Sequence, residues 1–179
     1  MGEWRGAVID GLDELQALQQ QAVHAADETL RSAREGFAEA GTGVEFLRWL
    51  KFDRGRPSPC EAGRMLTAIE QANQVMTWLV SLAGVGVLLQ RHPDSVPFRA
   101  CYPAQGGPDI AGDGVRAEAF ATKDDHVVLR LDSEGQRLHA IPEAAHKYIF
   151  FCAPGFPETQ RIDALCMDEI EVWSVCIGA

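Results

Sequence analysis

The sequence lacks the marks of several common functional classes. It contains no phosphate-binding loop, no glycine pattern of dinucleotide binding and no Ser-His-Asp order of a hydrolase. Its five cysteines include no Cys-x-x-Cys pair, and neither they nor the five histidines have zinc-ligand spacing. Basic residues are scarce, with 16 Lys and Arg against 26 Asp and Glu, which disfavours a protein that coats nucleic acid non-specifically.

The chain also lacks an apolar run long enough to cross a bilayer. The longest run, residues 75–89, falls short of the roughly 20 residues that a membrane span needs. No signal-peptide pattern opens the chain, and the odd number of cysteines argues against a disulfide framework. We therefore expect a cytoplasmic protein with free thiols and no membrane contact.

What is present is enough apolar material for a core, since 46% of the 179 residues are hydrophobic. The pattern predicts a first helix over residues 3–40, in which apolar residues recur at steps of three, four or seven. They are Val8, Leu12, Leu15, Ala22, Ala26, Leu30, Ala33 and Phe37. Such a helix is about 50 Å long, so it either packs along its own chain or pairs with a second copy, which would make a homodimer.

Two further helices are predicted before the strands begin. One covers residues 44–52, and the other covers residues 58–89, because Ser58 and Glu61 have capping-box spacing with a proline between them. Gly84 within the third helix would let a neighbouring element approach closely. The helices up to residue 57 would form an extension, and residues 58–179 an α/β core domain.

The remaining sequence is strand-like. An Asp-Gly step at residues 113–114 predicts a hairpin turn, and alternation favours a strand over a helix at residues 127–131. A helical turn at 143–146 and a short helix at 161–167 interrupt the series. The predicted fold is α/β or α+β, with N-terminal helices followed by a mixed sheet of about four to five strands. The predicted strands are residues 98–102, 115–121, 127–131, 148–152 and 170–177.

One short stretch carries a resemblance to a known family. Pro108-Asp109 precedes a strand, and Glu118 follows on the next one. From residue 58 onward the chain resembles the restriction-endonuclease-like, or PD-(D/E)XK, superfamily. The resemblance implies that Asp109 and Glu118 ligate Mg²⁺, with Glu70 from the preceding helix assisting, and that the metal activates a water for phosphodiester cleavage. The chain is also similar to uncharacterised bacterial proteins with an IEQxNQ helix, an AExFA strand and an HKYxFF strand.

The sequence departs from the family pattern at its lysine. Phe120 stands where the resemblance expects that lysine, and a phenyl ring cannot polarise a water or stabilise negative charge. Lys123, Arg130 and Lys147 are the candidates for a migrated base, and the spacing singles out none of them. This departure argues against catalysis more than it argues against metal binding.

Each of the three acids also has a simpler interpretation. Asp109 can cap a turn through its own backbone. Glu118 can face solvent, because strand alternation places the small apolar residues of its strand on the other face. Glu70 can be an ordinary acid on a helix surface. The sequence leaves these alternatives open.

The only basic cluster consists of Arg48, Lys51, Arg54 and Arg56, and it would meet nucleic acid or an acidic protein partner if it is more than a solvated surface. Our leading hypothesis is a non-catalytic binding or assembly protein on a degenerate nuclease-like fold, which dimerises through its long helix. The alternative is a Mg²⁺-dependent nuclease acting on DNA or RNA.

Overall fold

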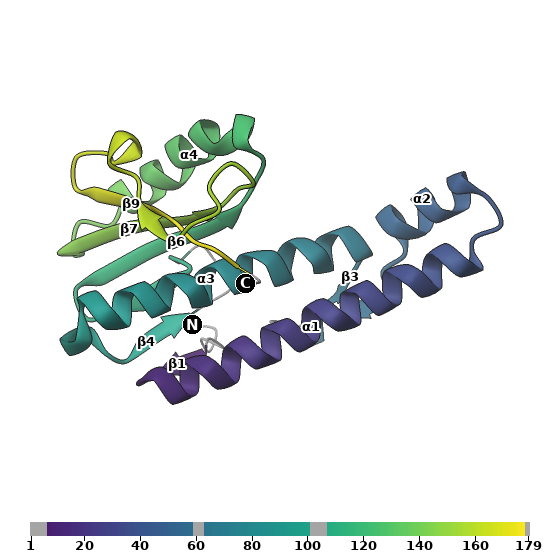
Figure 1. The fold of residues 1–179 in the computed structure, drawn as a ribbon, viewed down its shortest axis with the longest axis horizontal. Helices are drawn as coiled ribbons and strands as arrows, with labels where there is room; N and C mark the ends of the chain where they lie inside the picture. Colours follow the sequence, from purple (N-terminus) through teal and green to yellow (C-terminus); the bar gives the residue numbers. More distant parts are fainter. Residues whose placement is uncertain (1–6, 59–62, 101–106, 178–179) are drawn as a thin grey trace.

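The computed structural model describes residues 7–58, 63–100 and 107–177, and within these the chain forms one mixed sheet of seven strands (Figure 1). The strands are β1 (Ala7–Ile9), β4 (Phe98–Ala100), β5 (Ile110–Gly112), β6 (Val115–Ala121), β7 (His146–Cys152), β8 (Gln160–Arg161) and β9 (Ile170–Ser174). Their order across the sheet is β1-β4-β5-β6-β7-β9-β8. The first four pair antiparallel, β7 and β9 continue parallel to β6, and β8 closes the edge antiparallel to β9.

This arrangement confirms a mixed α/β fold, and the described residues contain more strands than the four to five that we expected. Two of the additional strands, β1 and β8, are three and two residues long, which is too short for an alternating pattern to reveal. The hairpin turn at residues 113–114 is confirmed, since β5 and β6 pair antiparallel across it. Residues 101–102 of the predicted strand 98–102 lie outside the described residues.

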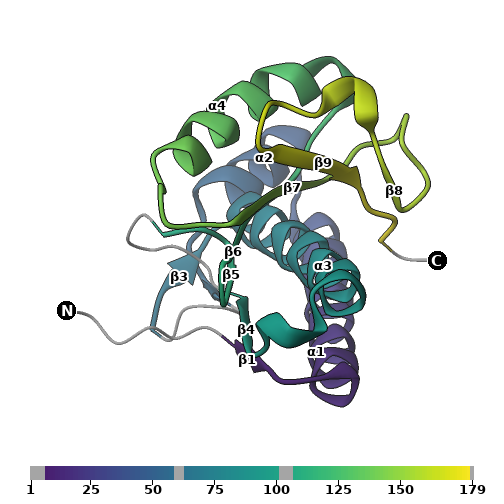
Figure 2. The same ribbon diagram turned by 90° about the vertical axis from the view of Figure 1, so that its left-hand side faces the viewer.

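The described residues also form four α-helices: α1 (Leu12–Glu39), α2 (Gly43–Phe52), α3 (Ala68–Arg91) and α4 (Val127–His139). Figure 2 shows α4 on one side of the sheet and α3, followed by α1, on the other. α1 and α2 project beyond the sheet as an arm (Figure 1). The smaller elements are a β2–β3 ladder (Arg56–Pro57 with Met65–Leu66) and the 3-10 turns η1 (Pro93–Ser95), η2 (Asp124–His126) and η3 (Asp163–Leu165).

The first helix begins later than the sequence suggested. It starts at Leu12, because the preceding residues of β1 pair with β4 in the sheet, while residues 3–6 lie outside the described part. Its end at Glu39 agrees with the prediction to within one residue. The predicted boundary between residues 57 and 58 stays a prediction, although β1 joins the sheet and α1 packs on α3.

The predicted start of the third helix at Ser58 is wrong. α3 begins at Ala68, where Thr67 and Glu70 form a capping box: the Thr67 hydroxyl accepts from the Glu70 amide, and the Glu70 carboxylate accepts from the Thr67 amide. The backbone of Gly63 has φ of 81°, which no right-handed helix contains. Glu61 of the predicted box lies outside the described residues, so a second box nine residues further on is the one observed.

The predicted strand at residues 127–131 is also wrong, because α4 occupies this segment. Val127, Leu131, Glu134 and Leu138 are buried at helical spacing on one side of α4. The parallel pairing of β6 with β7 requires a crossover of about a dozen residues, and α4 supplies it. The predicted helical turn at residues 143–146 is a non-helical turn leading into β7, and the predicted helix at 161–167 is reduced to η3.

Side chains of β6 alternate between two cores. Ala117 and Ala119 face α3, and their small size suits a helix that lies close to the sheet. A Cβ on Gly84 of α3 would lie 2.5 Å from the Phe150 ring, which confirms the expected close approach. Among the described residues, α3 is the one helix that is long and apolar enough, by length and composition alone, to cross a membrane. Its buried face packs on the sheet, as expected for the core helix of a globular fold.

Candidate functional site

Asp109 and Glu118 lie side by side on the α4 face of the sheet. β5 pairs with β6 so that Ile110 is opposite Ala117, which places the preceding Asp109 opposite Glu118. Both are buried, with 7% of Asp109 and 1% of Glu118 exposed. Asp109 Oδ2 accepts a 2.8 Å hydrogen bond from the amide of Ala119. The structure therefore brings the two predicted acids together, and Glu118 does not face solvent.

Burial raises the pKa of both carboxyl groups. The pKa of Asp109 rises to about 6, and desolvation together with the neighbouring Asp109 charge raises the pKa of Glu118 to about 9. As two ionised carboxylates, the pair leaves Glu118 Oε2 buried without a hydrogen-bond partner among the described residues. A proton shared between the two carboxyl groups removes that deficit. At neutral pH the pair accordingly holds one proton.

Arg137 of α4 closes the carboxyl pair. Its Nη2 lies 3.3 Å from Glu118 Oε1 and donates a 3.2 Å hydrogen bond to the carbonyl of Gly107. Its Nη1 donates a 2.8 Å hydrogen bond to Glu134, which is also buried. Arg130 binds the other oxygen of Glu134 at 2.8 Å. Two arginines thus face three carboxyl groups, and one shared proton makes this polar cluster neutral. The polar cluster consists of Asp109, Glu118, Arg130, Glu134 and Arg137.

Phe120 belongs to the core and not to the polar cluster. It is 1% exposed, and its ring centroid lies 6.0 Å from that of Phe151 on the next strand. The guanidinium of Arg130 stands 5.2 Å from the Phe120 ring. The position that the resemblance assigns to a lysine therefore holds packing surface between β6 and α4.

The lysines proposed as replacements lie elsewhere. Lys123 follows β6, is exposed and precedes η2. Lys147 is 5% exposed and lies opposite Arg116 on the neighbouring strand β7. It is therefore diagonal to Glu118, which lies opposite Ile149. Its amine is 3.4 Å from Glu169. Arg130, the remaining replacement, reaches the cluster only through Glu134.

Glu70 acts in the local structure of α3. Its Oε2 accepts a 2.8 Å hydrogen bond from the amide of Thr67, and its Oε1 lies 3.8 Å from Arg54. The hydrogen bond to the Thr67 backbone is the main cause of the lowered pKa of Glu70. These are the contacts of a helix-capping acid, and the role as a third metal ligand stays a prediction.

The basic cluster separates into two parts. Arg48 and Lys51 are exposed on α2. Arg54 pairs with Glu70. Arg56 is 9% exposed, stacks 4.0 Å from the Trp49 ring and donates a 3.0 Å hydrogen bond to Ser32. Arg56 therefore holds α1, α2 and β2 together, which leaves a reduced surface charge for a partner.

As arranged, the cluster does not fit a divalent cation. Mg²⁺ takes oxygen ligands at 2.0–2.1 Å in octahedral geometry, and here the Arg137 guanidinium already lies 3.3 Å from Glu118 Oε1. No group of three or more His, Cys, Asp or Glu side chains in the described part of the chain is placed to hold a metal. A cation would have to displace both Arg137 and the shared proton.

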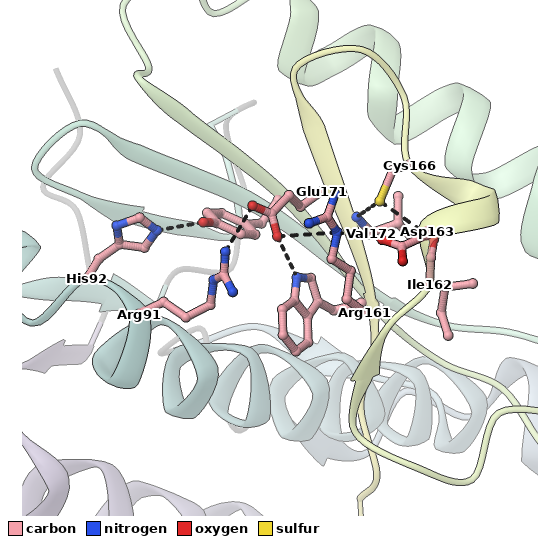
Figure 3. A network of polar contacts seen from close by, with 10 residues as sticks. Arg91, His92, Arg161, Ile162, Asp163, Cys166, Glu171 and Val172 are labelled. Atoms are coloured by element: carbon pink, nitrogen blue, oxygen red, sulfur yellow. Dashed lines mark hydrogen bonds and ion pairs between the residues drawn. The ribbon is translucent and has the colours of Figure 1, made fainter.

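A second polar network lies on the opposite face of the sheet, where α3 ends (Figure 3). Glu171 accepts a 3.0 Å hydrogen bond from Arg91 and a 3.2 Å bond from the Trp173 indole. His92 Nε2 lies 2.5 Å from the Tyr148 hydroxyl. Burial is the main cause of the lowered pKa of His92. No sequence pattern pointed to this network, which joins the last turn of α3 to β7 and β9 (Figure 3).

The described cysteines are free thiols, as expected. Cys152, Cys166 and Cys176 form no disulfide among the described residues, and Cys60 and Cys101 lie outside them. Cys166 Sγ accepts from the amide of Val172 at 3.3 Å, which gives this thiol a structural contact at the start of β9.

Comparison of the chain with models of protein families, with curated proteins and with solved structures finds no match. The resemblance to the restriction-endonuclease-like superfamily accordingly stays a prediction.

Proposed function

We propose that this chain is a non-catalytic binding or assembly protein on a nuclease-like fold. The observation that carries the proposal is the position of Arg137, whose guanidinium contacts Glu118 and Glu134 where a catalytic cation would otherwise bind. Phe120, in the place of the catalytic lysine, is core packing. The order of α3, three antiparallel strands, a crossover helix and a parallel strand supports the kinship with nucleases. The free thiols suit a cytoplasmic location.

The assembly is a homodimer made through α1. The first half of α1 packs on α3 through Leu15 and Ala22, while Leu30 and Phe37 in the second half are 50% and 68% exposed. Leu15 and Ala22 of the apolar stripe are thus covered within the chain, whereas Leu30 and Phe37 stay half or more exposed, although Phe37 touches Phe46 of α2. Exposed apolar side chains that continue one stripe are typical of an interaction surface. Arg48 and Lys51 of α2 would add contacts to an acidic protein or nucleic-acid partner.

The solution mass tests the assembly. Light scattering on the purified chain is expected to give twice the chain mass of 19.6 kDa at micromolar concentration. Dilution should return the monomer mass, because two halves of a helix bury less surface than an obligate interface. A monomer at all concentrations up to the millimolar range would contradict dimerisation.

The second candidate is a Mg²⁺-dependent nuclease acting on DNA or RNA. The adjacency of Asp109 and Glu118 favours it, as does the buried Glu118 Oε2 that lacks a partner when both groups are ionised. In this candidate Lys123 or Lys147 replaces the missing catalytic lysine, although neither contacts the acid pair.

Calorimetric titration with Mg²⁺ and Mn²⁺ distinguishes the two candidates. We expect no binding heat at millimolar metal, because the cation would have to displace Arg137 and a shared proton. The matched control is the isosteric double variant Asp109→Asn with Glu118→Gln. Saturable binding in the wild type that disappears in this variant would favour the nuclease and justify cleavage assays on DNA and RNA.

A further inference from the structure

The outer half of α1 carries a regular row of large apolar side chains. Val23, Leu30 and Phe37 are seven residues apart and are 52%, 50% and 68% exposed. A seven-residue spacing keeps side chains on one side of a helix over two turns. The row runs along the arm, where α1 projects beyond the sheet (Figure 1). Phe37 at its end touches Phe46 of α2, with ring centroids 5.3 Å apart, and remains mostly exposed.

A second row of small residues runs beside the first. Ala26, Ala33 and Ala40 have the same seven-residue spacing, each three residues after a large one, and all are half-buried. They lie on the side of the large row that turns toward α3. Large and small positions therefore alternate along one strip of α1, which favours close packing against a helix with the reverse alternation.

The same helix running in the opposite direction has that reverse alternation. In an antiparallel pair of α1 helices, Leu30 meets Ala33 of the second copy. Val23 then meets Ala40, and Phe37 meets Ala26. Every large side chain faces a small one, and the overlap is about 27 Å long at 1.5 Å per residue. A parallel pair would instead set large against large and leave gaps between the alanines.

The charges beside the row complete the match. Asp27 and Arg34 are exposed on the outer flank, and neither has an ion-pair partner among the described residues. In the antiparallel pair Asp27 lies beside Arg34 of the second copy, and the two-fold symmetry repeats the contact. A parallel pair would set this flank against the side of Ala22, Thr29 and Gly36, which contains no charge.

We propose that α1 pairs antiparallel with α1 of a second copy over Val23–Ala40, with Leu30 against Ala33 at the centre and two Asp27–Arg34 ion pairs at the flank. This inference rests on the proposed assembly function and specifies its partner and geometry.

Charge exchange tests the geometry. Asp27→Arg or Arg34→Asp alone sets like charges against each other twice per dimer, and each should raise the dimer dissociation constant at least tenfold in low salt. The double variant Asp27→Arg/Arg34→Asp should restore the wild-type constant to within about threefold. Glu39→Arg is the control, because at 3.6 residues per turn it points away from the row and is exposed. Sedimentation equilibrium measures the dissociation constants of the wild type and the four variants, and circular dichroism confirms that each variant is folded.

The outcomes separate the inference from the function on which it rests. A monomeric wild type overturns both. The wild type can instead form a dimer whose dissociation constant changes no more with the single charge exchanges than with Glu39→Arg. That result would support the assembly and overturn the antiparallel register.

Cross-linking provides an independent readout of direction. Val23→Cys and Ala40→Cys chains, mixed and oxidised with glutathione disulfide, should form a covalent dimer that neither variant forms alone. Within one antiparallel pair, two copies of the same position are about 25 Å apart, since 17 residues separate them. The wild-type chain is the control for background cross-linking, because its own exposed Cys176 can also be oxidised. Covalent dimers in each variant alone, above this background, would show parallel pairing and overturn the proposal.

Discussion

Replacing Arg137 with leucine is expected to lower the free energy of unfolding by about 2–3 kcal/mol. Removing one partner of a buried ion pair leaves the other charge uncompensated, which costs about 3–5 kcal/mol when both groups are fully buried. Glu118 and Glu134 are nearly inaccessible, while 41% of the Arg137 side chain is exposed, so solvent reduces the loss. Urea unfolding at pH 7 measures the change.

Arg130→Leu is the matched control for this substitution. Arg130 lies on the same helix and also binds Glu134, but it does not reach Glu118 and its side chain is 49% exposed. Its removal should cost about 1 kcal/mol or less, because Arg137 still compensates the buried Glu134 and Arg130 itself is half exposed. Adding Glu118→Gln to the Arg137→Leu variant should recover part of the loss, because glutamine stays neutral without having to take up a proton at pH 7. Equal losses in the two single variants would show that Arg137 has no special relation to the acid pair.

The role of Arg137 bears directly on the functional proposal. A catalytic metal site needs acidic ligands that are free to coordinate the cation. Here the acids are buried, one shared proton and one guanidinium neutralise them, and the expected lysine is a core phenylalanine. The arrangement stabilises the packing of α4 on β6. Such an arrangement agrees with the proposed non-catalytic function, in which these acids serve packing and not metal binding.

Local patterns of the sequence predicted the centre of the sheet well. The Asp-Gly step and the alternation after it identify β6 with its observed bounds, and the apolar run at 148–152 lies within β7. The hairpin register follows from the turn, so the adjacency of Asp109 and Glu118 could be predicted from the chain alone. Short edge strands such as β1 and β8 could not, because their pairing depends on distant segments.

The closing residues of the site were missed for one physical reason. Residues 127–131 have the β-branched pair and alternation of a strand, so local propensity contradicted the helix that the parallel crossover requires. Arg130, Glu134 and Arg137 are spaced four and three residues apart, which is the spacing of ion pairs on a helix. That spacing was the available sequence signal for both α4 and the ion-pair cluster. It outweighs the strand propensity of residues 127–131 only when the crossover between the parallel strands β6 and β7 is also considered.

The shared proton leads to a second large expected effect, on the pH dependence of stability. Asp109 and Glu118 have folded-state pKa values of about 6 and about 9, above the ordinary values of 3.8 and 4.5. Between the ordinary and the raised pKa values the folded protein holds more protons than the unfolded one. The free energy of unfolding therefore falls as the pH rises from about 4.5 to about 9, with a slope of up to about 1.4 kcal/mol per pH unit for each proton of difference.

Glu118→Gln removes this dependence at its source. Glutamine matches the shape of a protonated Glu118 and has no proton to lose, so the variant should equal the wild type near pH 5 and exceed its stability by several kcal/mol at pH 9. Urea unfolding from pH 5 to pH 9 gives both curves, and their difference cancels the contribution of all other titrating groups. Glu39→Gln, which removes an exposed acid from α1, should run parallel to the wild type throughout. Parallel curves for Glu118→Gln as well would mean that the acid pair is ionised in the folded protein, and a cation site would then become the better explanation of the buried Glu118 oxygen.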